Sequence, residues 1–212
     1  MSSTRSPPDT GQAAWPNLAS PTAALFPNAR FPEFKEVPSV VVDQRIMIVG
    51  SGGSGKTYLA HQLADLLHLP VTHLDSIYYD ADWNPIAPSY FEHVQRELVS
   101  GERWIIEGNY VSTLPIRLTG ADTVIFLDIG ALTCLFGIAR RRWRYRGGQH
   151  RDGVYDRITW SFLRYVAGYR KTMRPRVLAL TEQHGQHARL ITLTSHRQVR
   201  RYLDHHTPAR RG

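Results

Sequence analysis

Short apolar runs alternate with longer amphipathic stretches over most of this 212-residue chain. Five apolar runs have the length and composition of buried strands, at residues 44–50, 71–74, 104–107, 123–127 and 189–193. Stretches with helical spacing lie between and after them, at residues 56–68, 90–100, 132–146, 157–173, 176–184 and 196–205. Short apolar strands that alternate with helices predict a parallel sheet covered by helices on both faces. We therefore expect an α/β three-layer sandwich with a five-stranded parallel sheet.

Some segments are less regular than this alternation. Residues 76–88 are rich in aromatic and loop-forming residues, and residues 111–118 form a short irregular or helical piece. Pro175 is expected to separate the last two helices before the fifth strand, because proline interrupts a helix. In the helix predicted over 132–146, several apolar residues share one face: Leu132, Leu135, Phe136, Ala139 and Trp143.

The first 43 residues differ in composition from the rest of the chain. They hold seven of the thirteen prolines: Pro7, Pro8, Pro16, Pro21, Pro27, Pro32 and Pro38. Proline removes backbone donors and interrupts regular elements, so residues 1–43 are predicted to be an extension that is largely disordered or draped on the domain. The folded domain is then expected over residues 44–206, with a short basic tail at 207–212.

The charge of the chain is unevenly distributed. The formal net charge is +8, and residues 139–212 alone hold eighteen basic and four acidic residues. Such a surface attracts polyanions, which include nucleotides, phosphorylated substrates and nucleic acid. The single cysteine, Cys134, excludes an internal disulfide, and the longest apolar runs are far below the ~20 residues of a membrane span. We expect a cytoplasmic protein that has no signal peptide and does not associate with a membrane.

A glycine-rich segment between the first strand and the first helix fits the pattern G-x-x-x-x-G-K-[ST]. It consists of Gly50, Ser51, Gly52, Gly53, Ser54, Gly55, Lys56 and Thr57. Strand, glycine loop and helix in this order are what a nucleoside triphosphate site requires. Glycines let successive N–H groups turn toward phosphate oxygens, and the helix adds the partial positive charge of its N-terminus. We expect Lys56 to reach the β- and γ-phosphates of ATP and the Thr57 hydroxyl to bind Mg²⁺.

From Ile46 onward, the order and spacing of motifs resemble those of the P-loop kinases related to adenylate and shikimate kinases. More narrowly, the chain is similar to the bacterial DNA topology modulation protein, or FlaR-like, group. The segments that carry the resemblance are Gly50–Thr57, His73–Asp75, Tyr78–Trp83, Arg103–Tyr110, Arg117–Leu118, Ala121–Asp128 and Arg140–Arg142. The resemblance covers residues 44–204. It implies ATP- and Mg²⁺-dependent phosphoryl transfer, with an Arg-rich lid near residues 140–157.

Two strand ends compete to supply the carboxylate beside the metal. Asp128 ends an apolar string and matches a Walker B on pattern alone, but it could equally be a strand-end cap or a turn residue. In adenylate-kinase-like enzymes this acid ends the strand next to the first strand and precedes a glycine. Glu107 resembles that position, with Glu where Asp is commoner. The resemblance therefore favours Glu107, together with Thr57, as the metal site.

The acceptor side is expected beyond the carboxyl end of the second strand, because ligands of parallel sheets bind there. In shikimate-kinase-like relatives an Asp at the position of Asp75 contacts the acceptor hydroxyl, so Asp75 could orient that hydroxyl or take its proton. The alternative is a turn or capping residue. Further acceptor contacts are expected from Tyr79, Trp83, Asn109, Tyr110 and Arg117. The aromatic residues could instead pack on the core, and Arg117 could form a surface salt bridge rather than bind an acceptor anion.

Arginines cluster at the end of the helix predicted over 132–146: Arg140, Arg141, Arg142, Arg144 and Arg146. Arginine near a helix C-terminus suits the helix dipole, but five exceed that need. In adenylate-kinase-like folds this segment is the lid, so the resemblance implies that Arg140 and Arg144, with Arg151 behind them, close over the triphosphate and act in catalysis. Guanidinium suits this role because it binds phosphate bidentately. After the fifth strand, Arg197 could stack on the base of the nucleotide, or this segment could be a capped helix start.

Two functions from different classes remain open. The leading hypothesis is a kinase that transfers the γ-phosphoryl group of ATP to a small acceptor, such as a nucleotide, a nucleoside or another metabolite. The alternative is a nucleic-acid-associated ATP-binding protein, which the basic C-terminal third permits. Against the alternative, the sequence contains no recognisable nucleic-acid-binding motif, and the arginines cluster where a lid is expected.

Overall fold

The computed structural model describes residues 43–80, 84–145 and 159–207, and for residues 144 and 145 it describes the backbone alone. Four predicted features lie outside the described residues. They are the extension up to residue 42, Trp83, the lid from residue 146 onward with Arg151, and the tail from residue 208. The side chain of Arg144 also lies outside the described residues. The predictions for these positions therefore stay predictions.

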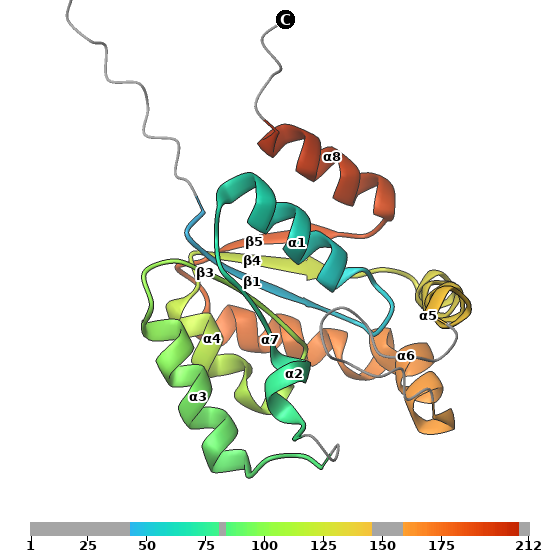
Figure 1. Ribbon diagram of the computed structural model, residues 1–212, viewed down its shortest axis with the longest axis horizontal. Coiled ribbons are helices and arrows are strands. Elements are labelled where there is room, and N and C mark those ends of the chain that lie inside the picture. The colour runs from blue at the N-terminus through green and yellow to red at the C-terminus, as the bar shows by residue number, and fades with distance from the viewer. Residues whose placement is uncertain (1–42, 81–83, 146–158, 208–212) are drawn as a thin grey trace, which may run out of the picture. The chain divides into compact units, whose positions relative to one another are not determined.

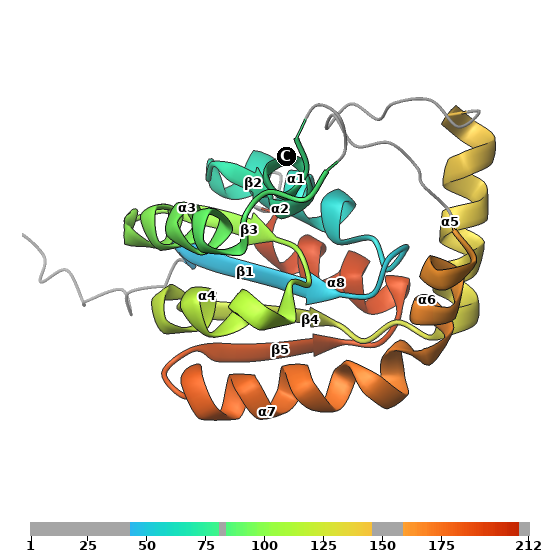
Figure 2. The same cartoon turned by 90° about the horizontal axis from the view of Figure 1, so that it is seen from below.

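The five strands form one parallel sheet in the order β2-β3-β1-β4-β5 (Figure 1). In chain order they are β1 (Arg45–Gly50), β2 (Val71–His73), β3 (Trp104–Glu107), β4 (Thr123–Leu127) and β5 (Arg189–Leu193). The predicted five-stranded parallel sheet is thus confirmed. β1 lies between β3 and β4, so the residues that follow these three strands meet at one edge of the sheet (Figure 2).

Helices cover both faces of the sheet, as predicted (Figure 1). The side chains of β1 alternate between the two faces, so Ile46 and Ile48 belong to one apolar core and Met47 and Val49 to the other. The first core includes side chains of α1 (Lys56–Leu67) and α8 (His196–His206). The second includes side chains of α3 (Pro88–Ser100), α4 (Leu114–Gly120) and α7 (Arg174–His184). The remaining helices are α2 (Leu74–Tyr78), η1 (Val111–Thr113), α5 (Ala131–Tyr145) and α6 (Trp160–Thr172).

Two boundaries differ from the prediction. Leu74, predicted as the end of the second strand, begins the short helix α2, and it is fully buried in the second core. The helix therefore starts at the last residue of the predicted strand and runs into the first residues of the segment, 76–88, that we predicted to be loop-rich. Pro175 does not separate two helices but lies in the first turn of α7, and the break falls at Met173. Proline is well tolerated there because a first-turn N–H has no partner within the helix.

The helix α5 leaves most of the predicted apolar stripe exposed, and of its five residues Leu135 packs against the first core. Leu132, Phe136 and Trp143 are 84%, 70% and 85% exposed, whereas Cys134 and Ile138 on the opposite side are buried. An apolar stripe usually faces the core. Here the buried side of α5 packs against the glycine loop, where a Cβ at Gly137 would lie 2.8 Å from the carbonyl oxygen of Gly53. The helix is therefore placed by its contact with the loop and not by its apolar stripe.

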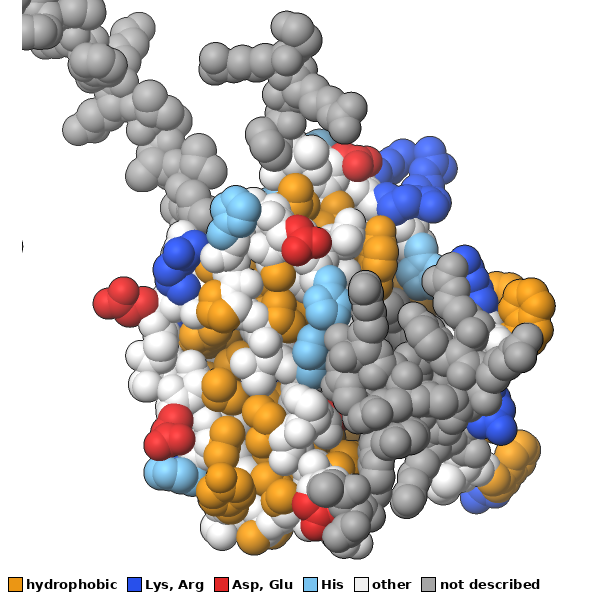
Figure 3. Space-filling model, in the orientation of Figure 1, with side chains coloured by type: hydrophobic (Ala, Val, Ile, Leu, Met, Phe, Trp, Pro, Cys, Tyr) orange, Lys and Arg blue, Asp and Glu red, His pale blue; other side chains and the backbone are white. Residues whose placement is uncertain are grey.

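Basic side chains gather on one side of the molecule, over α8 and along α5 (Figure 3). They include Arg140, Arg142, Arg197, Arg200 and Arg201, all of which are exposed. Within the described part of the chain, no helix combines the length and apolar character that a membrane span requires.

Candidate active site

The glycine loop joins the end of β1 to the first residue of α1. Gly53 and Gly55 adopt left-handed backbone angles, with φ of 75° and 96°. A Cβ at Gly53 would overlap the carbonyl oxygen of Cys134 on α5, so only glycine allows this close approach. Lys56 begins α1, and its Nζ donates to the carbonyl oxygen of Ser51, 3.1 Å away. The lysine ammonium therefore lies back over the loop, at a helix N-terminus that favours anions.

Glu107 ends β3, directly beside β1, and its carboxylate meets the start of α1. The Thr57 hydroxyl donates to Glu107 Oε1 at 3.0 Å, and His73 Nδ1 lies 2.9 Å from the same oxygen. Because a carboxylate only accepts, His73 donates through Nδ1. Burial raises the pKa of Glu107, but the hydrogen bond from His73 and the charge of Lys56 outweigh burial and hold that pKa below its ordinary value. Glu107 is therefore an ionised carboxylate beside the glycine loop.

These residues fit Mg²⁺ that arrives with a nucleotide. Magnesium takes hard oxygen ligands and is usually bound by one or two protein groups together with phosphates and water. Thr57 Oγ1 and Glu107 Oε1 supply two such oxygens at the N-terminus of α1. Across the described residues, no group of three or more His, Cys, Asp or Glu side chains could hold a metal ion by itself.

Asp128 follows β4, on the other side of β1, and has different partners. Its Oδ1 accepts from Arg170 Nε at 3.0 Å and its Oδ2 from Arg174 Nε at 2.9 Å. Arg170 Nη2 also donates to the carbonyl oxygen of Asp128 at 2.9 Å. The carboxylate is 4% exposed and ties the end of β4 to the junction of α6 and α7. Of the two carboxylates weighed for the metal, Glu107 thus contacts the glycine loop, and Asp128 forms a structural clamp.

Asp75 lies in the first turn of α2, at the same edge of the sheet. Its Oδ1 accepts from the Tyr110 hydroxyl at 2.7 Å, and the rest of the carboxylate is exposed. Burial, reinforced by the Asp75 charge, raises the pKa of Tyr110, so the phenol stays protonated and remains a donor. The ring of Tyr110 packs on Tyr78 and Phe91, with centroids 4.7 and 4.9 Å apart. Asp75 and Tyr110, both predicted at the acceptor site, therefore lie in contact.

Tyr79 packs edge-on against the Tyr78 ring, with the ring centroids 4.9 Å apart, and Tyr79 is 37% exposed. It therefore belongs to the aromatic cluster under α2, as the packing alternative proposed, and still presents a surface. Trp83, the other predicted aromatic contact, lies outside the described residues.

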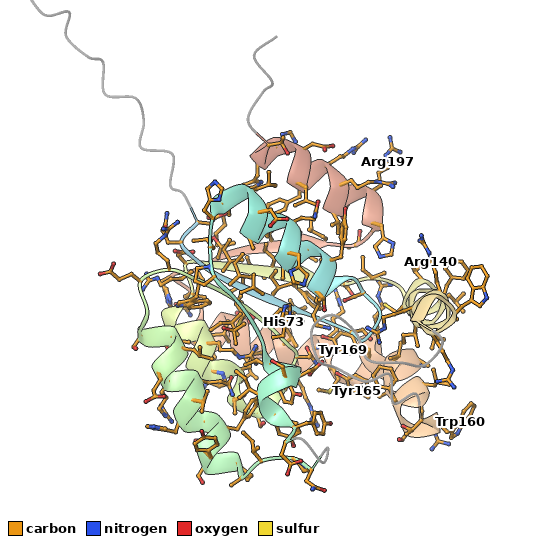
Figure 4. All side chains as sticks on the ribbon, in the orientation of Figure 1. His73, Arg140, Trp160, Tyr165, Tyr169 and Arg197 are labelled. Atoms are coloured by element: carbon orange, nitrogen blue, oxygen red, sulfur yellow. The ribbon has the colours of Figure 1, made fainter. Side chains whose placement is uncertain are left out.

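Asn109 is held by two tyrosines of α6, Tyr165 and Tyr169, which are labelled on that helix in Figure 4. Its Nδ2 donates to the Tyr165 hydroxyl at 2.7 Å, and the Tyr169 hydroxyl donates to its Oδ1 at 2.8 Å. Burial raises the pKa of both phenols, which keeps them protonated. The sequence analysis assigned no role to Tyr165 and Tyr169. Their spacing of four residues on one helix face was the available signal, but their partner lies 56 and 60 residues away along the chain.

Arg117 lies inside the protein. Its side chain is fully buried, so it does not form the surface salt bridge weighed as the alternative. Instead, Nη1 donates to the carbonyl oxygen of Gly108 and Nη2 to that of Tyr110, each at 2.8 Å. Burial lowers the pKa of Arg117 to about 9, so the guanidinium is still charged at neutral pH. Arg117 holds the loop that carries Asn109 and Tyr110.

The predicted lid and base contacts lie on the surface. Arg140 on α5 and Arg197 on α8 are both exposed and extend away from the core (Figure 4). The capped helix start weighed for this segment is present, because the Ser195 hydroxyl accepts from Gln198 N at the start of α8. The neighbouring His196 contacts the glycine loop, with Nε2 3.3 Å from the carbonyl oxygen of Ser54.

Comparison with solved structures finds kinases with low sequence identity. A sugar kinase from Janibacter sp. HTCC2649 has a TM-score of 0.48 and 17% identity, over 76% of this chain and 93% of that one. Shikimate kinase from Acinetobacter baumannii in complex with shikimate gives the same score and identity, over 76% and 89%. Deoxyadenosine kinase from M. mycoides has a TM-score of 0.45 and 12% identity, over 75% and 94%.

No protein-family model and no curated protein matches the chain. TM-scores below 0.5 establish neither a shared substrate nor a shared activity. The function therefore has to follow from the residues described above.

Proposed function

We propose that this chain is a small P-loop kinase that transfers the γ-phosphoryl group of ATP to a small acceptor in the presence of Mg²⁺. The observation that carries the proposal is the contact of Thr57 with Glu107, 3.0 Å, at the end of a glycine loop that also carries Lys56. A flexible loop with no ligand would not require a buried, ionised carboxylate at this hydroxyl. Asp75 lies at the same edge of the sheet and completes the site on the acceptor side.

On the nucleotide side, the main-chain N–H groups of residues 50–57 bind the phosphates, and Lys56 neutralises charge on the β- and γ-phosphates. Thr57 and Glu107 would hold Mg²⁺, which would neutralise charge on the phosphates. His73 keeps Glu107 oriented toward Thr57, because its Nδ1 contacts the same carboxylate oxygen. Arg140 and Arg144 are proposed to close over the γ-phosphoryl group, and Arg197 is proposed to contact the base.

On the acceptor side, Asp75 is the proposed general base. The acceptor oxygen forms a bond to the γ-phosphorus while the bond from that phosphorus to the β–γ bridging oxygen breaks. The electron pair of the broken bond leaves with ADP, and the acceptor proton passes to Asp75. Tyr110 donates to Asp75 Oδ1 and orients the carboxylate for this step.

Calorimetry with ATP, at millimolar concentration of Mg²⁺, tests the nucleotide site. We expect the whole chain to bind ATP. Lys56→Ala should lower the affinity for ATP by at least about tenfold, because the proposed contact of the ammonium with phosphate is then lost. A panel of small acceptors with ATP then tests transfer, read as a phosphorylated product formed in equal amount to ADP. Failure of the chain to bind any nucleoside triphosphate would overturn the proposal.

The acceptor panel, together with a measurement of DNA binding, also tests the nucleic-acid alternative. Binding to duplex DNA that falls steeply with salt, without any phosphorylated small molecule in the panel, would favour that alternative. The exposed arginines of α8 would then be the first residues to replace.

A further inference from the structure

Resting on the proposed function, we infer that the acceptor presents an uncharged hydroxyl group to the γ-phosphate, and not a phosphate group as a nucleoside monophosphate would. The inference concerns the substrate class of the site, which the glycine loop does not determine. It follows from the charges and hydrogen bonds of the residues around Asp75.

The first observation is the charge of the acceptor side. Asp75 is an exposed carboxylate at the reacting end, and its described partner is the neutral Tyr110 phenol. A hydroxyl acceptor can donate its proton to such a carboxylate. A phosphate acceptor, which carries close to two negative charges at neutral pH, has no proton to donate and is repelled by it.

The second observation is the position of Arg117. It contacts the loop that carries Asn109 and Tyr110, so it would be the natural partner of an acceptor phosphate there. Its guanidinium is fully buried and donates to the carbonyl oxygens of Gly108 and Tyr110. It is therefore used to shape the loop, and an acceptor phosphate does not reach it.

The third observation is Asn109, which directly precedes Tyr110, the hydrogen-bond partner of Asp75. Asn109 is oriented by Tyr165 and Tyr169, so its amide is held by two neutral hydroxyls. Neutral donors and acceptors of this kind match the hydroxyls of a substrate, which both donate and accept hydrogen bonds. They do not neutralise a dianion.

A groove along α6 continues from Tyr165 and offers room for the body of the acceptor. Its volume is about 490 Å³, within the range of small-molecule sites. Its described lining consists of Trp160, Ser161, Arg164, Tyr165, Gly168 and Thr172. Arg164 is the cation among these residues, and it lies on the exposed face of α6. Two of the six described lining residues, Trp160 and Tyr165, are aromatic and one, Arg164, is charged, so the groove offers aromatic faces to an uncharged body with a flat or apolar face.

The test compares matched pairs of acceptors that differ only in a phosphate group. Four nucleosides and their 5′-monophosphates, and a hexose and its 6-phosphate, are offered with ATP and Mg²⁺ to the whole chain. We expect kcat/KM for at least one uncharged member to exceed that of its phosphorylated partner by about 100-fold or more. A phosphorylated member that is used faster than its uncharged partner, with the new phosphoryl group carried on its phosphate, would overturn the inference while leaving the proposed kinase activity intact.

A charge-neutral variant extends the test to binding, so that it also decides the case in which no compound of the panel is turned over. Calorimetry measures a nucleoside monophosphate and inorganic phosphate on the chain loaded with ADP and Mg²⁺. We expect Asp75→Asn to bind these anions at least about threefold more tightly than the unaltered chain, since it removes a like charge. Asp65→Asn, on the exposed face of α1, is the matched control and should leave anion binding unchanged. Unchanged or weaker anion binding in Asp75→Asn would overturn the inference. If the chain bound no nucleotide at all, the proposed function itself would fail.

Discussion

The ends of β3 and β4 make a natural comparison, because both strands flank β1 and both lead into a buried carboxylate. At the end of β3, Glu107 meets a hydroxyl from the glycine loop and an imidazole from β2. At the end of β4, Asp128 meets two guanidinium groups from α6 and α7. Hydroxyl and imidazole leave the carboxylate able to serve a cation, whereas two arginines neutralise it. The partners that the fold brings to a strand end, and not the strand itself, decide what its acid does.

Glu107→Gln should cause the largest effect, because it removes the carboxylate charge at the end of β3. Gln keeps the size and can still accept from Thr57, but it removes the negative charge from the proposed metal site. We expect kcat/KM for ATP to fall by about 100-fold. The melting temperature should change little because the hydrogen bond to Thr57 can persist.

Steady-state kinetics over a series of Mg²⁺ concentrations measures this effect, with Asp128→Asn as the matched carboxylate-to-amide control. If Asp128→Asn lost activity per folded molecule as strongly as Glu107→Gln, the assignment of the metal side to β3 would be wrong.

Asp128→Asn should act on stability instead. The amide removes the charge that holds Arg170 and Arg174, and hydrogen bonds between charged groups contribute more than neutral ones. Both arginines are about half exposed, at 49% and 45%, which moderates the loss. We expect the free energy of unfolding to fall by about 2 kcal/mol. Urea denaturation measures it, and a stability equal to that of the unaltered chain would contradict a structural clamp.

The fold and the nucleotide side could be predicted because their signals are local. The five predicted strands match the observed ones to within one residue at each end, and the glycine loop lies between β1 and α1 as expected. Buried strands and glycine loops are encoded by contiguous residues. The order of the strands, which places both Glu107 and Asp128 beside β1, is set by tertiary packing and does not follow from the apolar pattern.

The acceptor side was less predictable because its contacts join distant segments. Asn109 is oriented by residues on α6, and Asp128 is neutralised from 42 and 46 residues away. The burial of Arg117 was not predicted for a related reason, since a charged side chain is rarely fully buried and exposure was the default expectation. The exposure of most of the apolar stripe on α5 was not predictable either, because the contact of this helix with Gly53 turns the opposite side inward.

Arg117→Met tests the loop that follows β3, because it distinguishes support of that loop by Arg117 from binding of the acceptor by Arg117. Methionine keeps most of the volume but leaves the carbonyl oxygens of Gly108 and Tyr110 without these donors. We expect the free energy of unfolding to fall by about 1.5 kcal/mol, within the range for buried groups that lose a partner. Thermal unfolding measures it. A raised KM for the acceptor at unchanged stability would instead indicate that Arg117 contacts the substrate.

Arg174→Gln and Arg170→Gln give the smallest effects and sharpen the β4 side. Arg170 donates both to Asp128 Oδ1 and to its backbone carbonyl, whereas the one described bond of Arg174 to this residue is to Oδ2. Arg170→Gln should therefore cost about 1 kcal/mol of stability and Arg174→Gln about 0.5 kcal/mol, as expected for half-exposed ion pairs. Urea denaturation of both variants, alone and combined with Asp128→Asn, tests this order. The arginine substitutions should add little once Asp128 is replaced, because the interaction that they remove is then already lost. Full additivity would show that the two arginines stabilise α6 and α7 independently of Asp128, and the clamp would not be the reason that this carboxylate differs from Glu107.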